Sequence, residues 1–150
     1  MHFESVLKVW RIKRANYVEI FDKNLEDEHI TQFARLMQTH LQDMQHISLR
    51  RNKIGNKGAE ALAEFIMLNT SHLTYLEISR NKIGDEGGAK ILEAMKKNTM
   101  IVTLLIDFGN EIKDSIAHKL ELEVQANQHI FTQIQGGLAP GSDMYACIRL

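Results

Sequence analysis

Residues with reactive side chains are spread along this sequence and do not form a known catalytic motif. The sequence contains no G-x-S-x-G, P-loop or H-E-x-x-H pattern, which would indicate a nucleophilic serine, a phosphate cradle or a zinc site. The seven histidines do not pair at metal-ligand spacing on a predicted helix, and the single cysteine, Cys147, has no identifiable histidine partner. We therefore predict that the protein is not an enzyme and uses no cofactor or metal.

One glycine-rich segment, GDEGGAK at residues 84–90, precedes a predicted helix and in that respect is similar to a phosphate-binding loop. Its spacing is not that of a P-loop, and the carboxylates of Asp85 and Glu86 would repel a phosphate. The segment GNKGAEAL at residues 55–62 has glycines at the corresponding positions. The glycines therefore indicate a repeated local structure, and we predict no small-molecule substrate.

This repeated structure extends well beyond the glycines. Asn52 and Asn81 each lie in the sequence RNKIG, and 81 − 52 gives a repeat of 29 residues. A fixed period of this length is typical of solenoid proteins. The same step relates the surrounding apolar residues and glycines: Met44, Ile47, Leu49, Ile54, Gly58, Leu62 and Ile66 correspond to Leu73, Leu76, Ile78, Ile83, Gly87, Ile91 and Met95.

Less regular copies flank this pair, as is usual for the outer repeats of a solenoid. Towards the C-terminus Asn110 comes one residue late, and towards the N-terminus Lys23 stands at the asparagine position. The apolar positions continue at Ala15, Val18, Ile20, Leu25, Phe33 and Met37 on one side and at Ile101, Leu104 and Ile106 on the other. We therefore predict about four repeats over residues 15–128.

Each repeat predicts one short strand followed by one helix. Ile47 and Leu49 alternate with Ser48 and Arg50, which is the period of a half-buried strand. We expect the turns after the strands to need positive φ at Gly55 and Gly84. The spacing of one helix face recurs at Ala59, Leu62, Ala63 and Ile66, and again at Ala89, Leu92 and Met95. Helices are expected over residues 27–39, 58–68, 86–97 and 113–125.

The pattern L-x-x-L-x-L-x-x-N-x-L in these repeats resembles that of the leucine-rich repeat family, over residues 15–128. The repeat length and the segment G-A-x-A-L-A are similar to the ribonuclease-inhibitor subtype, and IVTLLIDFGNEI is similar to the last repeat of tropomodulin-type domains. The resemblance implies an α/β fold, namely a right-handed β-α solenoid in a short horseshoe arc. A parallel sheet would form its concave face and the helices its convex face.

The two ends of the chain lie outside the clear repeats. Residues 1–14 are expected to form an N-terminal cap or a degenerate repeat, with a weak strand at residues 7–12 that would contain Trp10. Residues 129–150 are expected to form a C-terminal cap or tail. In this tail GGLAPGSD predicts a loop, and MYACIRL is expected to add an edge strand, to cover the last repeat or to extend freely.

The resemblance also implies roles for particular side chains. Asn52 and Asn81 would turn inward and form a ladder that satisfies backbone groups left open after each strand. Residues between the buried strand positions would project from the concave face and contact a partner. By register these are Tyr17, Glu19, Phe21, Asp22, His46, Ser48, Arg50, Arg51, Tyr75, Glu77, Ser79, Arg80, Thr103, Leu105, Asp107 and Phe108.

Several interpretations of this surface stay open. Tyr and Arg are enriched at binding hot spots, but Arg50 or Arg80 would equally pair with Glu19 or Glu77 on adjacent strands. Binding through the helical face, the loops or the tail, and a purely structural role, are alternatives. A net charge of −1 and a pI near 6.7 argue against nucleic acid and an anionic membrane as partners.

These features together favour a non-catalytic module that binds another protein and regulates or inhibits it. The resemblance implies further alternatives: an actin- or cytoskeleton-associated domain like tropomodulin, a bacterial effector that regulates another effector or a host protein, and a fragment of a larger receptor or ciliary protein. A single cysteine suits a reducing compartment. We expect a cytoplasmic location, or the host cytoplasm for a secreted effector.

Overall fold

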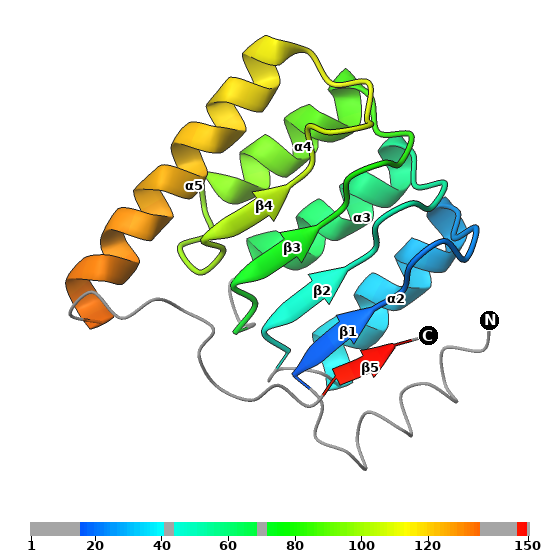
Figure 1. Cartoon of the computed structure of the whole chain (residues 1–150), viewed down its shortest axis with the longest axis horizontal. Helices are drawn as coiled ribbons and strands as arrows, with labels where there is room; N and C mark the ends of the chain where they lie inside the picture. Colours follow the sequence, from blue (N-terminus) through cyan, green and yellow to red (C-terminus); the bar gives the residue numbers. More distant parts are fainter. Residues whose placement is uncertain (1–15, 41–43, 69–71, 136–146, 150) are drawn as a thin grey trace.

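The computed structural model describes residues 16–40, 44–68, 72–135 and 147–149. The predictions for residues 1–14, including Trp10, and for the loop at residues 136–143 lie outside these residues. Strands and helices alternate along the described chain (Figure 1). They are β1 (Tyr17–Glu19), α2 (Asp27–His40), β2 (His46–Ser48), α3 (Asn56–Met67), β3 (Tyr75–Glu77), α4 (Asp85–Met95), β4 (Thr103–Leu105), α5 (Asp114–Gln135) and β5 (Cys147–Arg149).

The strands form one parallel sheet in the order β4-β3-β2-β1-β5, and the helices lie on one side of it (Figure 1). Val18 pairs with Ile47, and Ile47 pairs with Leu76, so the 29-residue step of the sequence is also the step between neighbouring strands. Leu76 pairs with Leu104 at a step of 104 − 76 = 28, whereas Asn110 keeps the step of 110 − 81 = 29, so Asn110 comes one residue late relative to its strand. The predicted α/β solenoid is confirmed.

The core lies between the sheet and the helices and is built from the repeated apolar positions. Ile47, Leu49 and Ile54 from one repeat have no exposed surface, and Leu62 and Ile66 of α3 cover them. Burying a side chain of this size contributes roughly 1.5–3 kcal/mol, so a row of such positions in every repeat holds each helix on the sheet. One position was predicted wrongly: Ala89 is exposed, and Gly88 lies on the buried side of α4.

Three asparagines satisfy the backbone where the chain leaves each strand. The Asn52 side chain accepts hydrogen bonds from the backbone N–H groups of Lys23 and Leu25 at 3.0 and 3.1 Å, and it donates to the carbonyls of Ile20 and Leu49 at 2.8 and 2.9 Å. Asn81 and Asn110 make equivalent bonds one and two repeats later. We call Asn52, Asn81 and Asn110 the asparagine ladder.

A second ladder joins the starts of the helices, and it was not predicted. Asp27, Asn56 and Asp85 are the first residues of α2, α3 and α4. Each side-chain oxygen accepts a hydrogen bond from a backbone N–H of the next repeat, at Gly55 (2.6 Å), Gly84 (2.8 Å) and Lys113 (2.8 Å). The signal was present in the sequence, since 56 − 27 and 85 − 56 both equal 29.

The expectation of positive φ at Gly55 and Gly84 is wrong, because their φ angles are −101° and −99°. Positive φ occurs instead at Arg51 and Arg80, with values of 58° and 53°. These arginines directly precede asparagines of the ladder, so the chain makes its sharp turn there and carries the asparagine side chain back into the core.

The C-terminal part of the described chain differs most from expectation. The helix expected to end at residue 125 continues as α5 to Gln135. β5 adds an edge strand, which was one of the three alternatives, and it pairs with β1 at the opposite end of the sheet from β4. Within the described residues no helix has the length and hydropathy needed to cross a bilayer.

Candidate functional site

None of the described helices covers one side of the sheet, which we call the open sheet face (Figure 1). Because parallel strands align residue by residue, the first residues of β1, β2 and β3 are neighbours: Tyr17 pairs with His46, and His46 with Tyr75. The His46 ring lies 4.0 Å from the Tyr17 ring and 3.8 Å from the Tyr75 ring, measured between centroids, and it is stacked on Tyr75 at an interplanar angle of 9°. These three residues form an aromatic row across the repeats.

His46 and Tyr75 of the aromatic row are uncharged at neutral pH. Burial lowers the pKa of His46 to about 4, which outweighs the opposing effect of the carboxylates of Glu77 and Glu19. Burial and the nearby Glu77 carboxylate also raise the pKa of Tyr75. A half-exposed row of rings, with Tyr75 stacked on His46 and Tyr17 tilted from it by 38°, is suited to contact an apolar or aromatic group of a partner.

The middle of the open sheet face is a closed polar network centred on Glu77. Its carboxylate accepts hydrogen bonds from the hydroxyls of Ser48 (2.9 Å) and Ser79 (3.2 Å), and the Arg50 guanidinium lies 3.9 Å from it. The ion pair is the one anticipated between adjacent strands. Ser48 and Ser79 are only 3% and 6% exposed. Both side chains are therefore buried on this face, and their role as partner contacts stays a prediction.

Arginines and phenylalanines occupy the edge where the strands end. The guanidinium groups of Arg50 and Arg51 lie 4.8 and 5.3 Å from the centre of the Phe21 ring, and that of Arg80 lies 4.9 Å from the Phe108 ring. Such stacking restrains a long side chain while leaving its charge accessible. Beside them is a shallow hollow of about 320 Å³ lined by Asp22, Asn24, Arg51, Asn52, Lys53 and Arg80.

The structure brings the other predicted contact residues except Asp107 to the same face with different exposure, and Asp107 lines a separate groove between β4 and α5. Tyr17, Glu19, Phe21 and Thr103 are half-buried, whereas Asp22, Asp107 and Leu105 are exposed. Phe108 is 62% exposed in spite of its contact with Arg80. The accessible part of the open sheet face therefore includes the aromatic row, Leu105 and the arginine–phenylalanine edge, and the Glu77 network lies between the row and the edge.

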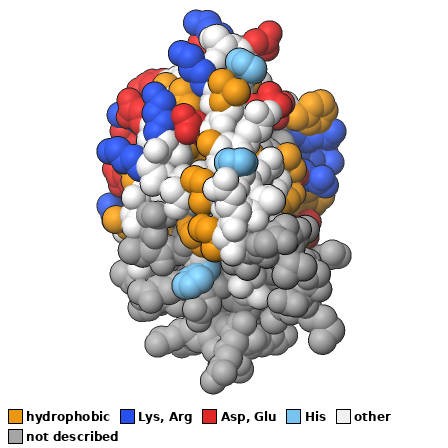
Figure 2. Space-filling model, turned by 90° about the vertical axis from the view of Figure 1, so that its left-hand side faces the viewer, with side chains coloured by type: hydrophobic (Ala, Val, Ile, Leu, Met, Phe, Trp, Pro, Cys, Tyr) orange, Lys and Arg blue, Asp and Glu red, His pale blue; other side chains and the backbone are white. Residues whose placement is uncertain are grey.

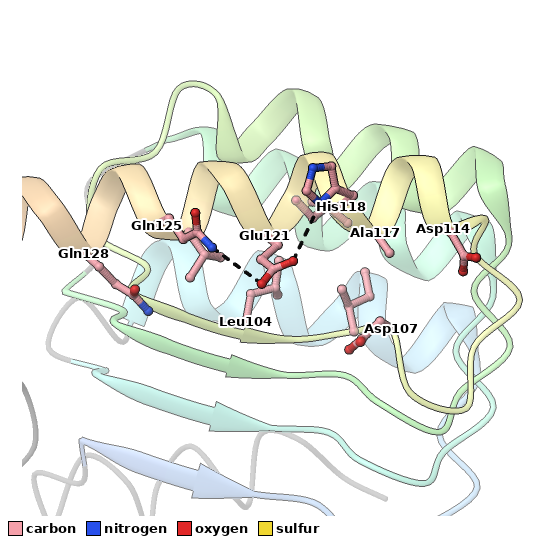
Figure 3. Close-up of a pocket in the computed structure, with 11 residues that line it drawn as sticks. Leu104, Asp107, Asp114, Ala117, His118, Glu121, Gln125 and Gln128 are labelled. Carbon is pink, nitrogen blue, oxygen red and sulfur yellow. Dashed lines mark hydrogen bonds and ion pairs between the residues drawn. The ribbon is translucent and has the colours of Figure 1, made fainter.

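A groove between β4 and α5 was missed in the sequence. It has a volume of about 500 Å³ and is open along the side of the sheet (Figure 3). Figure 2 shows hydrophobic side chains at the surface of this end of the molecule, among acidic and basic ones. The sequence held one signal for it, the absence of a further strand and asparagine after Asn110 at the repeat spacing. The groove is lined by Leu104, Ile106, Asp107, Asp114, Ala117, His118, Leu120, Glu121, Val124, Gln125 and Gln128.

The described residues contain no group of three or more His, Cys, Asp or Glu side chains arranged to hold a metal ion. The backbone of Cys147 belongs to β5. The described groups of this face are stacked rings, arginines beside aromatic rings and a hydrogen-bonded carboxylate. These groups can contact the surface of another molecule, and none of them is a nucleophile activated by a neighbouring base.

Comparison with known proteins agrees with this architecture. A family model described as a leucine rich repeat matches residues 40–63 and 70–92, the two central repeats. No curated protein matches the chain significantly. Of the solved structures that match, two illustrate the shared fold. Leiomodin-1 actin-binding site 2 is 14% identical with a TM-score of 0.65, and the match covers 90% of this chain and 94% of that one.

The second solved structure is the C-terminal domain of tropomodulin from Caenorhabditis elegans. It is 16% identical with a TM-score of 0.55, and the match covers 92% of this chain and all of that one. The described chain therefore has the leucine-rich repeat fold, and its two central repeats match the family model, as the repeat pattern predicted. Its assignment to the ribonuclease-inhibitor subtype stays a prediction.

Proposed function

We propose that the protein is a non-catalytic module that binds another protein through the open sheet face and so regulates or inhibits it. The observation that carries this proposal is the aromatic row of Tyr17, His46 and Tyr75, which is preformed by stacking and half-exposed. Aromatic and arginine side chains held rigidly lose little conformational entropy on binding, and such residues dominate measured binding energies.

The chemistry of the face defines the kind of partner. An apolar or aromatic segment would lie on the aromatic row, and carboxylates would meet Arg51 and Arg80 at the strand ends, where Lys53 adds a further positive charge. The Glu77 network between them is already satisfied internally. Leucine-rich repeats form a protein-interaction fold, but fold alone does not name a partner.

Replacing Tyr75 and Arg50 together by alanine tests the proposal. Affinity capture followed by mass spectrometry should recover one dominant protein with the wild type and lose it with Tyr75→Ala/Arg50→Ala. A control variant, Leu68→Ala/Lys97→Ala, removes an exposed apolar side chain and an exposed cation on the helical side and should retain the partner. Equal capture by all three proteins would place the binding site elsewhere.

Actin is the second candidate partner, supported by the likeness of the fold to a domain titled as an actin-binding site. The match covers 90% of this chain and 94% of that domain. Co-sedimentation with actin filaments measures this directly. Pelleting of the wild type with filaments, reduced in the Tyr75→Ala/Arg50→Ala variant, would identify actin as the partner of the open sheet face. A protein that stays in the supernatant at all filament concentrations would remove actin as a candidate.

A further inference from the structure

The described sheet ends at β4 with an open edge. The backbone hydrogen bonds that join each strand to the next are not continued beyond β4 by any described strand. The backbone N–H groups of Ile20, Leu49 and Ile78 donate to carbonyls of the following strand at 2.8, 2.8 and 2.9 Å. By register Ile106 is the next member of this series, since Leu76 pairs with Leu104. No described strand lies beyond β4 to accept a hydrogen bond from Ile106.

Leu104 presents a second open position at this edge. In a parallel pair, successive residues direct their backbone groups to opposite sides. The Thr103 N–H donates to the Thr74 carbonyl at 3.1 Å, so Thr103 faces β3, and the N–H and carbonyl of Leu104 face the groove. Along this edge the Leu104 N–H, the Leu104 carbonyl and the Ile106 N–H therefore follow one another. An added parallel strand would form hydrogen bonds with them in this order.

One side chain of α5 already imitates such a strand. The carbonyl of Thr74 accepts the N–H groups of Val102 and Thr103 from the next repeat. The equivalent carbonyl one repeat later is that of Val102, and it accepts a hydrogen bond from the Gln128 side chain at 2.8 Å. Gln128 thus takes the place of one strand residue at the start of the groove, and the positions at Leu104 and Ile106 stay open.

The groove has an apolar floor that lacks a cover. Ile47 and Leu76, which occupy the central strand position in the inner repeats, are at most 1% exposed, whereas Leu104 at the same position is half-buried. Leu120 and Val124 of α5 line the facing wall. An extended segment with apolar side chains directed towards α5 would therefore bury surface as the inner strands do.

The polar lining of the groove is acidic. Asp107, Asp114 and Glu121 line it, and no lysine or arginine does. Glu121 contacts Gln125 at 3.5 Å and His118 at 3.8 Å (Figure 3). Asp107 follows β4 and Asp114 begins α5, so a strand parallel to β4 would pass these two carboxylates with its C-terminal half. Positive charge is favoured there.

We propose that the groove between β4 and α5 binds an extended segment of a partner protein, which adds to β4 as a further parallel strand. The segment carries apolar residues at alternate positions and lysine or arginine in its C-terminal half. Addition of a strand to an exposed sheet edge is a general mode of peptide recognition. This site is distinct from the open sheet face, so the proposal does not depend on the function proposed above.

A synthetic peptide with the sequence of residues 44–53, MQHISLRRNK, is a suitable probe. It has alternating Ile47 and Leu49 followed by Arg50, Arg51 and Lys53. Within the chain this sequence forms β2, which lies parallel to β3. Titration of the labelled full chain with this peptide, followed by NMR, should show saturable binding with the largest shifts at the amides of Leu104 and Ile106.

Charge reversal in the groove separates this site from others. Asp107→Lys/Asp114→Lys should weaken binding of the peptide by about tenfold or more, as expected on loss of two facing opposite charges. Glu64→Lys/Glu93→Lys makes the same change of net charge at exposed helix positions and should leave the affinity within about twofold. Tyr75→Ala/Arg50→Ala should also bind the peptide normally.

Three results would overturn the proposal. They are the absence of saturable binding, shifts that map to the open sheet face, and equal loss of affinity in both charge-reversed variants. Self-association of the chain that is abolished by Asp107→Lys/Asp114→Lys, measured by sedimentation, would assign the groove to a second copy of this protein and would likewise reject a peptide of a partner as its occupant.

Discussion

At the scale of single residues, the ladder asparagines replace hydrogen-bond partners that a turning chain loses at the end of each strand. One amide group can accept and donate at once, and Asn81 in this way makes bonds within its own repeat and to the preceding one, with only 7% of its surface exposed. An apolar side chain of similar size would leave these backbone groups buried and unpaired.

We therefore expect Asn81→Leu to lower the free energy of unfolding by about 1–3 kcal/mol, the usual cost of unsatisfied buried polar groups. Urea denaturation of the full chain measures this difference. Gln32→Leu is the control, because it removes an exposed amide of α2 and should change stability by less than about 0.5 kcal/mol. Equal stability of the Asn81 variant and the wild type would contradict the structural role of the ladder.

His46 predicts a dependence of stability on pH. Its pKa in the folded protein is about 4, below the usual 6.5, so as the pH falls the unfolded chain binds a proton first. The stabilisation from neutral His46 is complete above pH 6.5 and is lost between pH 6.5 and about 4. Since the ring is half-exposed, the loss is expected to be on the order of 1 kcal/mol.

His46→Phe keeps a flat ring in the aromatic row and removes the titrating group. Comparing urea unfolding of both proteins at neutral pH and near pH 4.5 isolates the effect from that of the carboxylates. The wild type should lose more stability on acidification than the variant. Identical losses would show that His46 is not buried enough to have a lowered pKa.

The structural positions of individual residues were predictable from the sequence where the residues recur at the repeat spacing. The 29-residue step placed Asn52 and Asn81 in equivalent positions before their bonds were known. Alternation along a strand also placed Ser48 and Ser79 correctly on the open sheet face. It could not show that they are buried, because both hydroxyls bond to the Glu77 carboxylate, which lies on the next strand from Ser48 and two residues before Ser79.

At the scale of elements, close packing of each helix start on the preceding repeat sets the geometry. A Cβ atom on Gly87 would lie 2.8 Å from the Asn56 side-chain oxygen and 2.9 Å from Ala59 and Ile83. These contacts join α4 to α3 and to the chain that precedes α4. Gly58 has the same role one repeat earlier, where its Cβ would lie 2.7 Å from Asp27.

Gly87→Ala should destabilise the protein by about 1–2 kcal/mol, because overpacking outweighs the higher helix propensity of alanine. Thermal unfolding followed by circular dichroism would measure it. Gly84→Ala is the matched control, since its Cβ would meet the Asn56 side chain at an ordinary 3.4 Å, and it should have a clearly smaller effect. A stabilised Gly87 variant would refute the close approach of these elements.

Element boundaries were predictable where glycines and asparagines mark them. The expected starts of α3 and α4 differ from those observed by only two and one residues, at Asn56 and Asp85. The end of α5 was not predictable from the repeat, because α5 continues past the last repeat position to Gln135. Pairing of β5 with β1 joins segments far apart in the sequence, and no local pattern specifies it.

At the scale of the whole molecule, the two ladders and the sheet run through all repeats and end together at the β4–α5 side. The solenoid therefore presents two surfaces with different chemistry. The open sheet face carries rings and arginines, and the groove carries open backbone groups and carboxylates. The repeat pattern of the sequence predicted the open sheet face. It did not predict the groove, which lies at the end of the repeats.

The most direct test of the central claim uses a photo-crosslinking amino acid in place of Leu105, which is 39% exposed on the open sheet face, or of Leu68, which is 49% exposed at the end of α3. The two positions match in residue type and exposure. We predict that irradiation with the captured partner crosslinks it through position 105 and not through position 68. Crosslinking through position 68 alone, or equally through both, would contradict binding by the open sheet face.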